Sequence, residues 1–190
     1  MKDINDYKLT DTVTVGEVRY WLANRDDTAK KKIIMLIDHR FTNRYIKHLS
    51  TIDSGFLMMA ISCLTIETLE SFKQGEKNTN GKSKKMFKDF FLSEKSHFPD
   101  FSGICNDFYS DIRCGILHQA ETTNAWRILR TGPLLIESDK VINARRFVEA
   151  LEKSIEDYIK RLQGEDWNSV IWKNAIVKIE DICDNCEETK

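Results

Sequence analysis

Apolar side chains recur at intervals of three or four residues along most of the chain, which is the spacing of one face of an α-helix. Thr14 and Glu17 have the spacing of a capping box, and Asn143 has the side chain of an N-cap. Gly75 and Gly164 each follow an apolar stripe and are typical helix stops. The pattern predicts helices over residues 14–24, 26–49, 53–72, 86–98, 106–120, 143–164 and 167–179.

Two of these segments have unusual patterns. In the second helix the stripe recurs every four residues, at Ile33, Ile37, Phe41, Tyr45 and Leu49. The segment 56–66 is apolar nearly all round, which indicates a helix at the centre of the fold. It is shorter than the roughly 20 residues that a membrane span requires, so we expect no membrane association.

The periodicity changes after residue 120. Short β-prone runs at 126–130 and 134–137 flank the turn residues Thr131-Gly132-Pro133 and predict a β-hairpin within about 125–142. No internal repeat or linker divides the chain. The sequence therefore predicts a single domain over 1–190, an all-α bundle of five to seven helices with a small β-hairpin insertion.

Charge and composition narrow the possible partners. An apolar fraction of 41% suffices for a core and excludes a wholly disordered chain, and a net charge of -1 excludes a uniformly basic coat for nucleic acid. A local basic surface remains open at residues 73–85, which we interpret as a lysine-rich loop. This loop is either a solvated connection or a segment that contacts phosphates through Lys82, Lys84 and Lys85.

The cysteines indicate neither disulfides nor a metal centre. Five scattered cysteines do not make a disulfide framework, and the polar first residues lack the form of a secretory signal, so we expect a cytoplasmic setting. Cys183 and Cys186 have metal-ligand spacing, but a structural zinc usually needs four ligands. No phosphate-binding glycine loop, dinucleotide fingerprint or zinc-protease motif is present. We expect no metal and no cofactor.

One pair of residues has the chemistry that RNA cleavage needs. RNA carries its own nucleophile, the 2′-hydroxyl, so cleavage requires a group that moves protons near neutral pH and a cation that binds the scissile phosphate. A histidine, with an unperturbed pKa of about 6.5, suits the first task, and the planar guanidinium of an arginine suits the second. His118 and Arg113 are the candidates, and four residues separate them.

The run Arg113-Cys114-Gly115-Ile116-Leu117-His118 resembles the signature of the HEPN superfamily. Those proteins are α-helical bundles, and many are metal-independent endoribonucleases that act as dimers, often in toxin–antitoxin or phage-defence systems. The resemblance implies a HEPN-like fold and cleavage of RNA to a 2′,3′-cyclic phosphate and a 5′-hydroxyl. It also implies a homodimer and, in such systems, an antitoxin or regulatory partner. Cys114 departs from the family pattern, which usually has a polar residue after the arginine.

The spacing of this pair constrains the site. Residues five apart on an ideal α-helix are separated by about 140° around the axis, so Arg113 and His118 do not share a face. Either the helix deforms near Gly115, or two copies of the chain combine their pairs in one cleft. Family members use the second arrangement, so we expect a homodimer in which Gly115 lets the helices approach closely.

Several other polar residues are candidates for supporting roles. A carboxylate of the third helix, Glu67 or Glu70, is placed to orient the Arg113 guanidinium. Asp111, Gln119 and Glu121 are alternatives for positioning, and each is otherwise an ordinary solvated or helix-pairing residue. A second basic pair, Arg44 and His48, shares one helix face and is interpreted as solvated surface.

Two functions of different classes fit these observations. The first is a HEPN-type endoribonuclease with Arg113 and His118 as catalytic residues. The second is a non-catalytic helical binding module that has kept the bundle and lost the reaction, which Cys114 favours.

Overall fold

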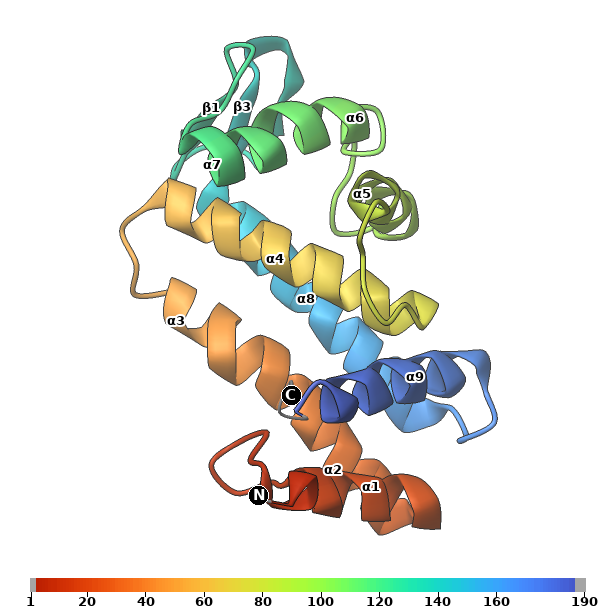
Figure 1. Cartoon of the computed structure of the whole chain (residues 1–190). Coiled ribbons are helices and arrows are strands. Elements are labelled where there is room, and N and C mark those ends of the chain that lie inside the picture. The colour runs from red at the N-terminus through yellow and green to blue at the C-terminus, as the bar shows by residue number, and fades with distance from the viewer. Residues whose placement is uncertain (1–2, 187–190) are drawn as a thin grey trace. The chain divides into compact units, whose positions relative to one another are not determined.

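The computed structural model describes residues 3–186, and most of them are helical (Figure 1). The helices are η1 (Ile4–Asp6), α1 (Val15–Asn24), α2 (Asp27–Asp38), η2 (His39–Ile46), α3 (Lys47–Leu49), α4 (Gly55–Gln74), α5 (Ser83–Ser93), α6 (Cys105–Asp107), η3 (Phe108–Arg113), α7 (Cys114–Gln119), η4 (Glu137–Asp139), α8 (Ala144–Gly164) and α9 (Val170–Asp184). The strands are β1 (Arg127–Leu129), β2 (Leu135–Ile136) and β3 (Val141–Asn143). The predominantly helical fold class is confirmed.

The chain forms two compact units. Unit 1 contains the described residues of 1–38, 71–78 and 159–190, and unit 2 contains 39–70 and 79–158. Each unit is assembled from separate stretches of the chain, and α4 and α8 contribute residues to both. No linker in the sequence therefore marks the boundary.

Unit 1 is organised by helix caps and by hydrogen bonds from α9. The predicted capping box is confirmed, since the Thr14 hydroxyl accepts from the Glu17 N–H and the Glu17 carboxylate accepts from the Thr14 N–H. Trp172 is fully buried, and its Nε1 donates to the Leu162 carbonyl at 2.9 Å. Asn174 donates to the Lys73 carbonyl at 2.6 Å, which ties the end of α4 to α9.

Unit 2 has a core of phenylalanine rings. Phe108 of η3 stacks on Phe147 of α8 with ring centroids 5.4 Å apart, and the Phe91 ring of α5 meets Phe108 edge-on at 4.9 Å. Such ring pairs stabilise a core beyond the apolar area they bury. They fix η3, and with it the start of α7, against α5 and α8.

Helix α4 has 20 residues, and by length and composition alone it could span a membrane. More than half of its apolar window is buried inside the protein, as expected of a core helix. In unit 2, α4 buries Met58, Met59, Cys63, Ile66 and Leu69.

The predicted β-hairpin is wrong in its pairing. Strands form in both predicted runs, but the sheet order is β1-β3-β2, so β1 and β2 do not pair. Strand β3 lies between them, parallel to β1 and antiparallel to β2. The sequence reading missed β3 because it placed Asn143 only as a helix cap. Asn143 does cap α8, with its side-chain oxygen accepting from the N–H groups of Arg145 and Arg146.

Two predicted helices contain π-helical segments. The predicted helix 26–49 is α-helical up to Asp38, π-helical over η2 and α-helical again in α3. The predicted helix 106–120 is π-helical over η3, immediately before α7. The predicted loop 73–85 is also shorter than expected, because α5 begins at Ser83 and places Lys84 and Lys85 in a helix.

Gly115 allows a close approach within one chain. A Cβ at this position would lie 2.5 Å from the Glu121 carbonyl oxygen and 3.3 Å from the Thr122 Cα. The segment that follows α7 therefore turns back across Gly115. The space that we expected Gly115 to leave for a partner helix is filled by the chain's own backbone.

We predict that Gly115→Ala destabilises the protein by about 1–3 kcal/mol, because the backbone at residues 121–123 must move to admit the methyl group. Thermal and urea unfolding measure the change. Gly164→Ala is the matched control, since Gly164 ends α8 and a Cβ there meets no atom within 4 Å. Equal stability of the two variants would contradict the close approach.

Candidate functional site

The Arg113 side chain is held in a polar cluster at the end of η3. Its Nη2 donates to Glu67 Oε2 of α4 at 3.0 Å, and each of the two side chains is 16% exposed. The guanidinium carbon lies 5.5 Å from the centre of the Tyr109 ring, and Nη1 lies 4.0 Å from Cys114 Sγ. Arg113 is thus fixed in place with a largely buried side chain, and its Nε is buried without a hydrogen bond in the described part of the chain.

The Glu67 carboxylate joins three segments of unit 2. While Oε2 accepts from Arg113, Oε1 accepts from the hydroxyls of Thr79 at 2.5 Å and Ser83 at 2.6 Å. Thr79 lies in the connection after α4, and Ser83 is the first residue of α5. One carboxylate therefore positions α5, its preceding connection and the candidate arginine.

The ionisation states in this cluster follow from its contacts. Burial raises the pKa of Glu67, but the hydrogen bonds from Ser83, Thr79 and Arg113 outweigh it and leave the pKa below its usual value. Burial lowers the pKa of Arg113, but the hydrogen bond and charge of Glu67 outweigh that effect and raise it. At neutral pH the two groups form a charged pair. Burial also raises the pKa of Cys63 and of Tyr109, which keeps both groups protonated.

His118 lies on α7 in a different environment. The residue is exposed, and its imidazole has no hydrogen bond or ion pair with the rest of residues 3–186. The stretch Cys114–Gln119 is α-helical, so the deformation that we considered near Gly115 does not occur. The π-helical segment ends at Arg113, before the intervening residues. Within one chain, the regular geometry of α7 directs the two side chains to different faces.

Asp111 supports the segment that follows His118. Asp111 is buried, and its Oδ1 accepts from the Thr123 hydroxyl at 3.0 Å and from the Asn124 amide at 2.9 Å. The segment needs such support, because Ala120, Asn124 and Ala125 all have positive φ, which costs free energy for residues other than glycine. Asp111 thus holds a strained turn next to α7 and makes no hydrogen bond to Arg113.

The other proposed supporting and substrate-binding residues lie at the surface. Gln119 is exposed, and its side chain has no hydrogen bond within the described residues. Glu121 accepts from the backbone N–H of Thr122 at 2.9 Å and does not reach Arg113. Lys82, Lys84 and Lys85 are all exposed at the start of α5, and Lys85 pairs with Asp89 at 2.5 Å.

The remaining candidates do not form a site. Arg44 and His48 are exposed on η2 and α3, and Glu70 is buried. Cys183 is buried in α9, and residues 3–186 contain no group of three or more metal-ligating side chains that could hold an ion.

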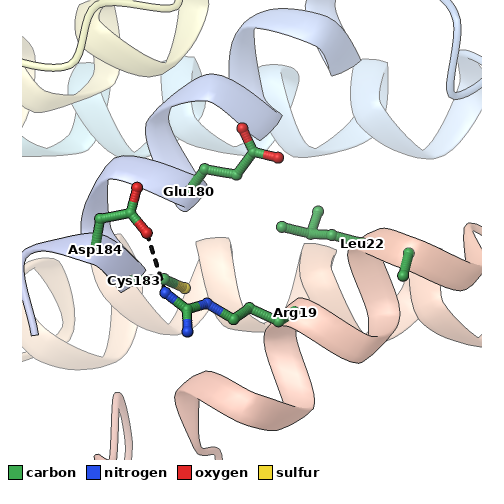
Figure 2. A pocket seen from close by; sticks show the side chains of 6 residues that line it. Arg19, Leu22, Glu180, Cys183 and Asp184 are labelled. Atoms are coloured by element: carbon green, nitrogen blue, oxygen red, sulfur yellow. Dashed lines mark hydrogen bonds and ion pairs between the residues drawn. The ribbon is translucent and has the colours of Figure 1, made fainter. Parts of the chain in front are cut away.

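A pocket of about 360 Å³ in unit 1 lies beside Cys183 (Figure 2). Its cation, Arg19, pairs with Asp184 at 3.1 Å, and the Arg19 Nη1 also donates to the Asn5 amide oxygen. Arg19 is therefore neutralised by Asp184, and the lining also includes the exposed carboxylate of Glu180.

No protein-family model matches the chain, and neither does any curated protein or solved structure. The geometry of unit 2 is therefore the basis for the functional proposal. Sequence reasoning offered Glu67 or Glu70 as a partner for Arg113, and Glu67 is the one that accepts its hydrogen bond. The same reasoning missed Thr79 and Ser83. The only feature in the sequence that could have indicated them is that both carry hydroxyl groups, in and directly after the connection that follows α4.

We predict that Glu67→Gln destabilises the protein by about 1–3 kcal/mol at neutral pH, because it weakens three hydrogen bonds to a largely buried group. The pKa of Glu67 is lower in the folded state than its ordinary value of 4.5. Its contribution is therefore present above that value and is lost as the pH falls through the folded-state pKa. Urea unfolding across this range measures the difference between the wild type and the variant.

We expect that difference to shrink on acidification below 4.5. Glu152→Gln, at an exposed position of α8, is the control and should leave the pH dependence unchanged. A constant difference between the wild type and Glu67→Gln at every pH would contradict a stabilising carboxylate at residue 67.

Proposed function

We propose that the protein is a HEPN-type, metal-independent endoribonuclease. One observation carries the proposal: Arg113 is fixed by Glu67 at 3.0 Å, and the exposed His118 imidazole on the same helical segment has no partner in the described part of the chain. A structural histidine of a folded domain usually has a hydrogen bond. An imidazole left open to solvent, in the same helical segment as a positioned guanidinium, suits proton transfer to a bound substrate.

The reaction follows from the chemistry of RNA. The ribose 2′-oxygen attacks the adjacent phosphorus, the bond from phosphorus to the 5′-oxygen breaks, and a 2′,3′-cyclic phosphate and a 5′-hydroxyl result. One proton leaves the 2′-hydroxyl and one proton is added to the departing 5′-oxygen. The imidazole of His118 accepts or donates the proton in one of these two transfers. Arg113 stabilises the charge on the phosphate oxygens with donors that Glu67 leaves free. No step in this scheme calls for a metal or a cofactor.

A homodimer is part of the proposal, because one chain presents the two groups on different helix faces. Helix α4 exposes Leu57 and Leu64 on either side of the half-buried Ile61, and Leu117 is exposed next to His118 on α7. The Arg113–Glu67 bond joins η3, which leads directly into α7, to α4. A two-fold interface over this surface would bring both copies of Arg113 and His118 into one cleft.

The biological setting is proposed from the resemblance to HEPN proteins alone. Such enzymes act in defence or toxin–antitoxin systems, and this role would place the protein in the cytoplasm with an antitoxin or regulatory partner. Lys82, Lys84 and Lys85 are proposed to contact the RNA backbone, with Lys84 the most available because its side chain has no partner within residues 3–186.

A non-catalytic binding module is the second candidate. The observation that favours it is the same ion pair, since Glu67 neutralises the charge of Arg113 and burial limits its access to a phosphate. Cys114 lies in the position where the family usually has a polar residue, and its Sγ lies beside the guanidinium. In this alternative the cluster serves only to hold η3 on α4.

We predict that the wild type cleaves structured RNA in the presence of EDTA and that His118→Ala lowers the rate by about 10²- to 10⁴-fold, the usual contribution of a general acid–base group. His48→Ala is the matched control, because His48 is also an exposed histidine on a helix of unit 2. Gel electrophoresis of the products, with identification of the cyclic phosphate end, measures the reaction.

Arg113→Lys keeps the positive charge but loses the planar fork, so we expect it to cleave more slowly while remaining folded. Cleavage that requires magnesium, or that persists in His118→Ala, would reject the mechanism. A folded dimer that cleaves no RNA would favour the binding module.

A further inference from the structure

Two arginines converge on one carboxylate oxygen at a surface of unit 2. Arg130 Nη1 and Arg145 Nη2 both donate to Asp53 Oδ1, the second at 3.2 Å. Arg130 Nη1 also donates to the Asp53 backbone carbonyl at 2.7 Å. Arg130 follows β1, Arg145 lies in the first turn of α8, and Asp53 precedes α4. Three separate elements thus meet at a single acceptor atom.

The fold positions both arginines from the backbone. Ile128 of β1 packs closely against Gly55, the first residue of α4. A Cβ added at Gly55 would lie 2.9 Å from the Ile128 Cγ2, so this contact fixes β1 against the start of α4. The Arg145 N–H is held by the Asn143 side chain at 3.1 Å. The two guanidiniums are therefore directed to one point by ordered backbone.

The charges at this point do not balance. Two permanent cations donate to one carboxylate, and the hydrogen bond and charge of Arg130 lower the pKa of Asp53, so these three side chains carry a net charge of about +1 at neutral pH. On its other side, Arg145 lines a pocket with Glu149 and Glu152. Asp53 is 78% exposed, and a surface ion pair of this kind contributes little to stability. The carboxylate can swing away at small cost and leave two guanidiniums with free donors.

Two forked guanidiniums around one oxygen form a binding geometry for phosphate. Arginine recognises phosphate and carboxylate oxygens with the same paired donors, so the Asp53 oxygen occupies the place that a phosphodiester oxygen would take. The pair is also linked to the candidate site. Thr122, which packs on Gly115, donates to the Trp126 carbonyl at 2.5 Å. Arg130 lies four residues after Trp126. Since an extended chain rises about 3.3 Å per residue, Arg130 lies about 13 Å from Trp126 along the direction of β1.

We propose that Arg130 and Arg145 bind a backbone phosphate of the RNA that flanks the cleaved linkage, and that Asp53 occupies this phosphate site when RNA is absent. The inference rests on the proposed function for the identity of the ligand. It differs from the proposed role of Lys82, Lys84 and Lys85, because those lysines lie on α5 and its preceding residue.

The test measures binding of a fully 2′-O-methylated oligoribonucleotide, which cannot be cleaved, by fluorescence anisotropy over a range of salt concentrations. Each lost phosphate contact should reduce the slope of log affinity against log salt by about 0.7. We expect Arg130→Gln and Arg145→Gln to show this reduction and to bind severalfold more weakly. Asp53→Asn should bind more tightly than the wild type, because the competing charge is gone.

Arg161→Gln is the matched control, since Arg161 is an exposed arginine of α8 outside this group, and its binding should equal that of the wild type. Circular dichroism confirms that each variant is folded. If the group is a phosphate site, the affinity for the oligoribonucleotide should rise in Asp53→Asn and fall in Arg130→Gln. If it is only a structural ion pair, both substitutions should change the affinity in the same direction. Unchanged binding in the two arginine variants, or weaker binding in Asp53→Asn, would overturn the inference.

The same variants separate this inference from the proposed function. If the wild type cleaves RNA while the arginine variants bind normally, the phosphate site is wrong and the nuclease stands. If the arginine variants lose binding while the wild type never cleaves, the phosphate site stands and the nuclease is wrong.

Discussion

The Glu67 carboxylate is the contact on which the candidate site depends. It is largely buried, and a buried charge is costly unless paired charges and hydrogen bonds compensate it. Here Arg113, Thr79 and Ser83 together supply that compensation. The three donors belong to different segments. Because the buried carboxylate needs all three hydrogen bonds, it restrains the position of each of these segments. One group therefore sets the position of η3, the start of α5 and the orientation of the guanidinium. Loss of any one donor would also affect the hydrogen bonds of the other two.

The sequence predicts what depends on local interactions. The capping box of α1, the Asn143 cap and the apolar stripes of the long helices depend on residues within one or two turns, and the structure contains them. The pairing of β1 was not predictable in this way, because its partner β3 lies beyond β2. The π-helical segments left a weak signal: the stripe through Phe41 and Tyr45 has a spacing of four, which exceeds the 3.6 residues of an α-helical turn and fits a locally widened helix.

The candidate site was predictable to a similar degree. A long acidic side chain on the core helix was a reasonable partner for Arg113, and Glu67 is placed accordingly. Asp111 was an equally reasonable alternative by sequence distance. Its short side chain instead accepts hydrogen bonds from Thr123 and Asn124 in the turn that follows its own helix. These bonds stabilise a turn that contains residues with positive φ. The hydroxyls of Thr79 and Ser83 carried no distinguishing pattern, since their role depends on how the connection after α4 returns to it.

The discontinuous make-up of the two units has a consequence for synthesis. Every stretch of unit 2 has been translated once residue 158 has left the ribosome, whereas unit 1 lacks α9 until residue 184 has been made. The segment that carries Glu67, Arg113 and His118 can therefore close on the nascent chain while the first helices still wait for their partner. Premature termination just before α9 would release a polypeptide with a formed phenylalanine core and an unprotected N-terminal helix pair, a substrate for the cell's proteases.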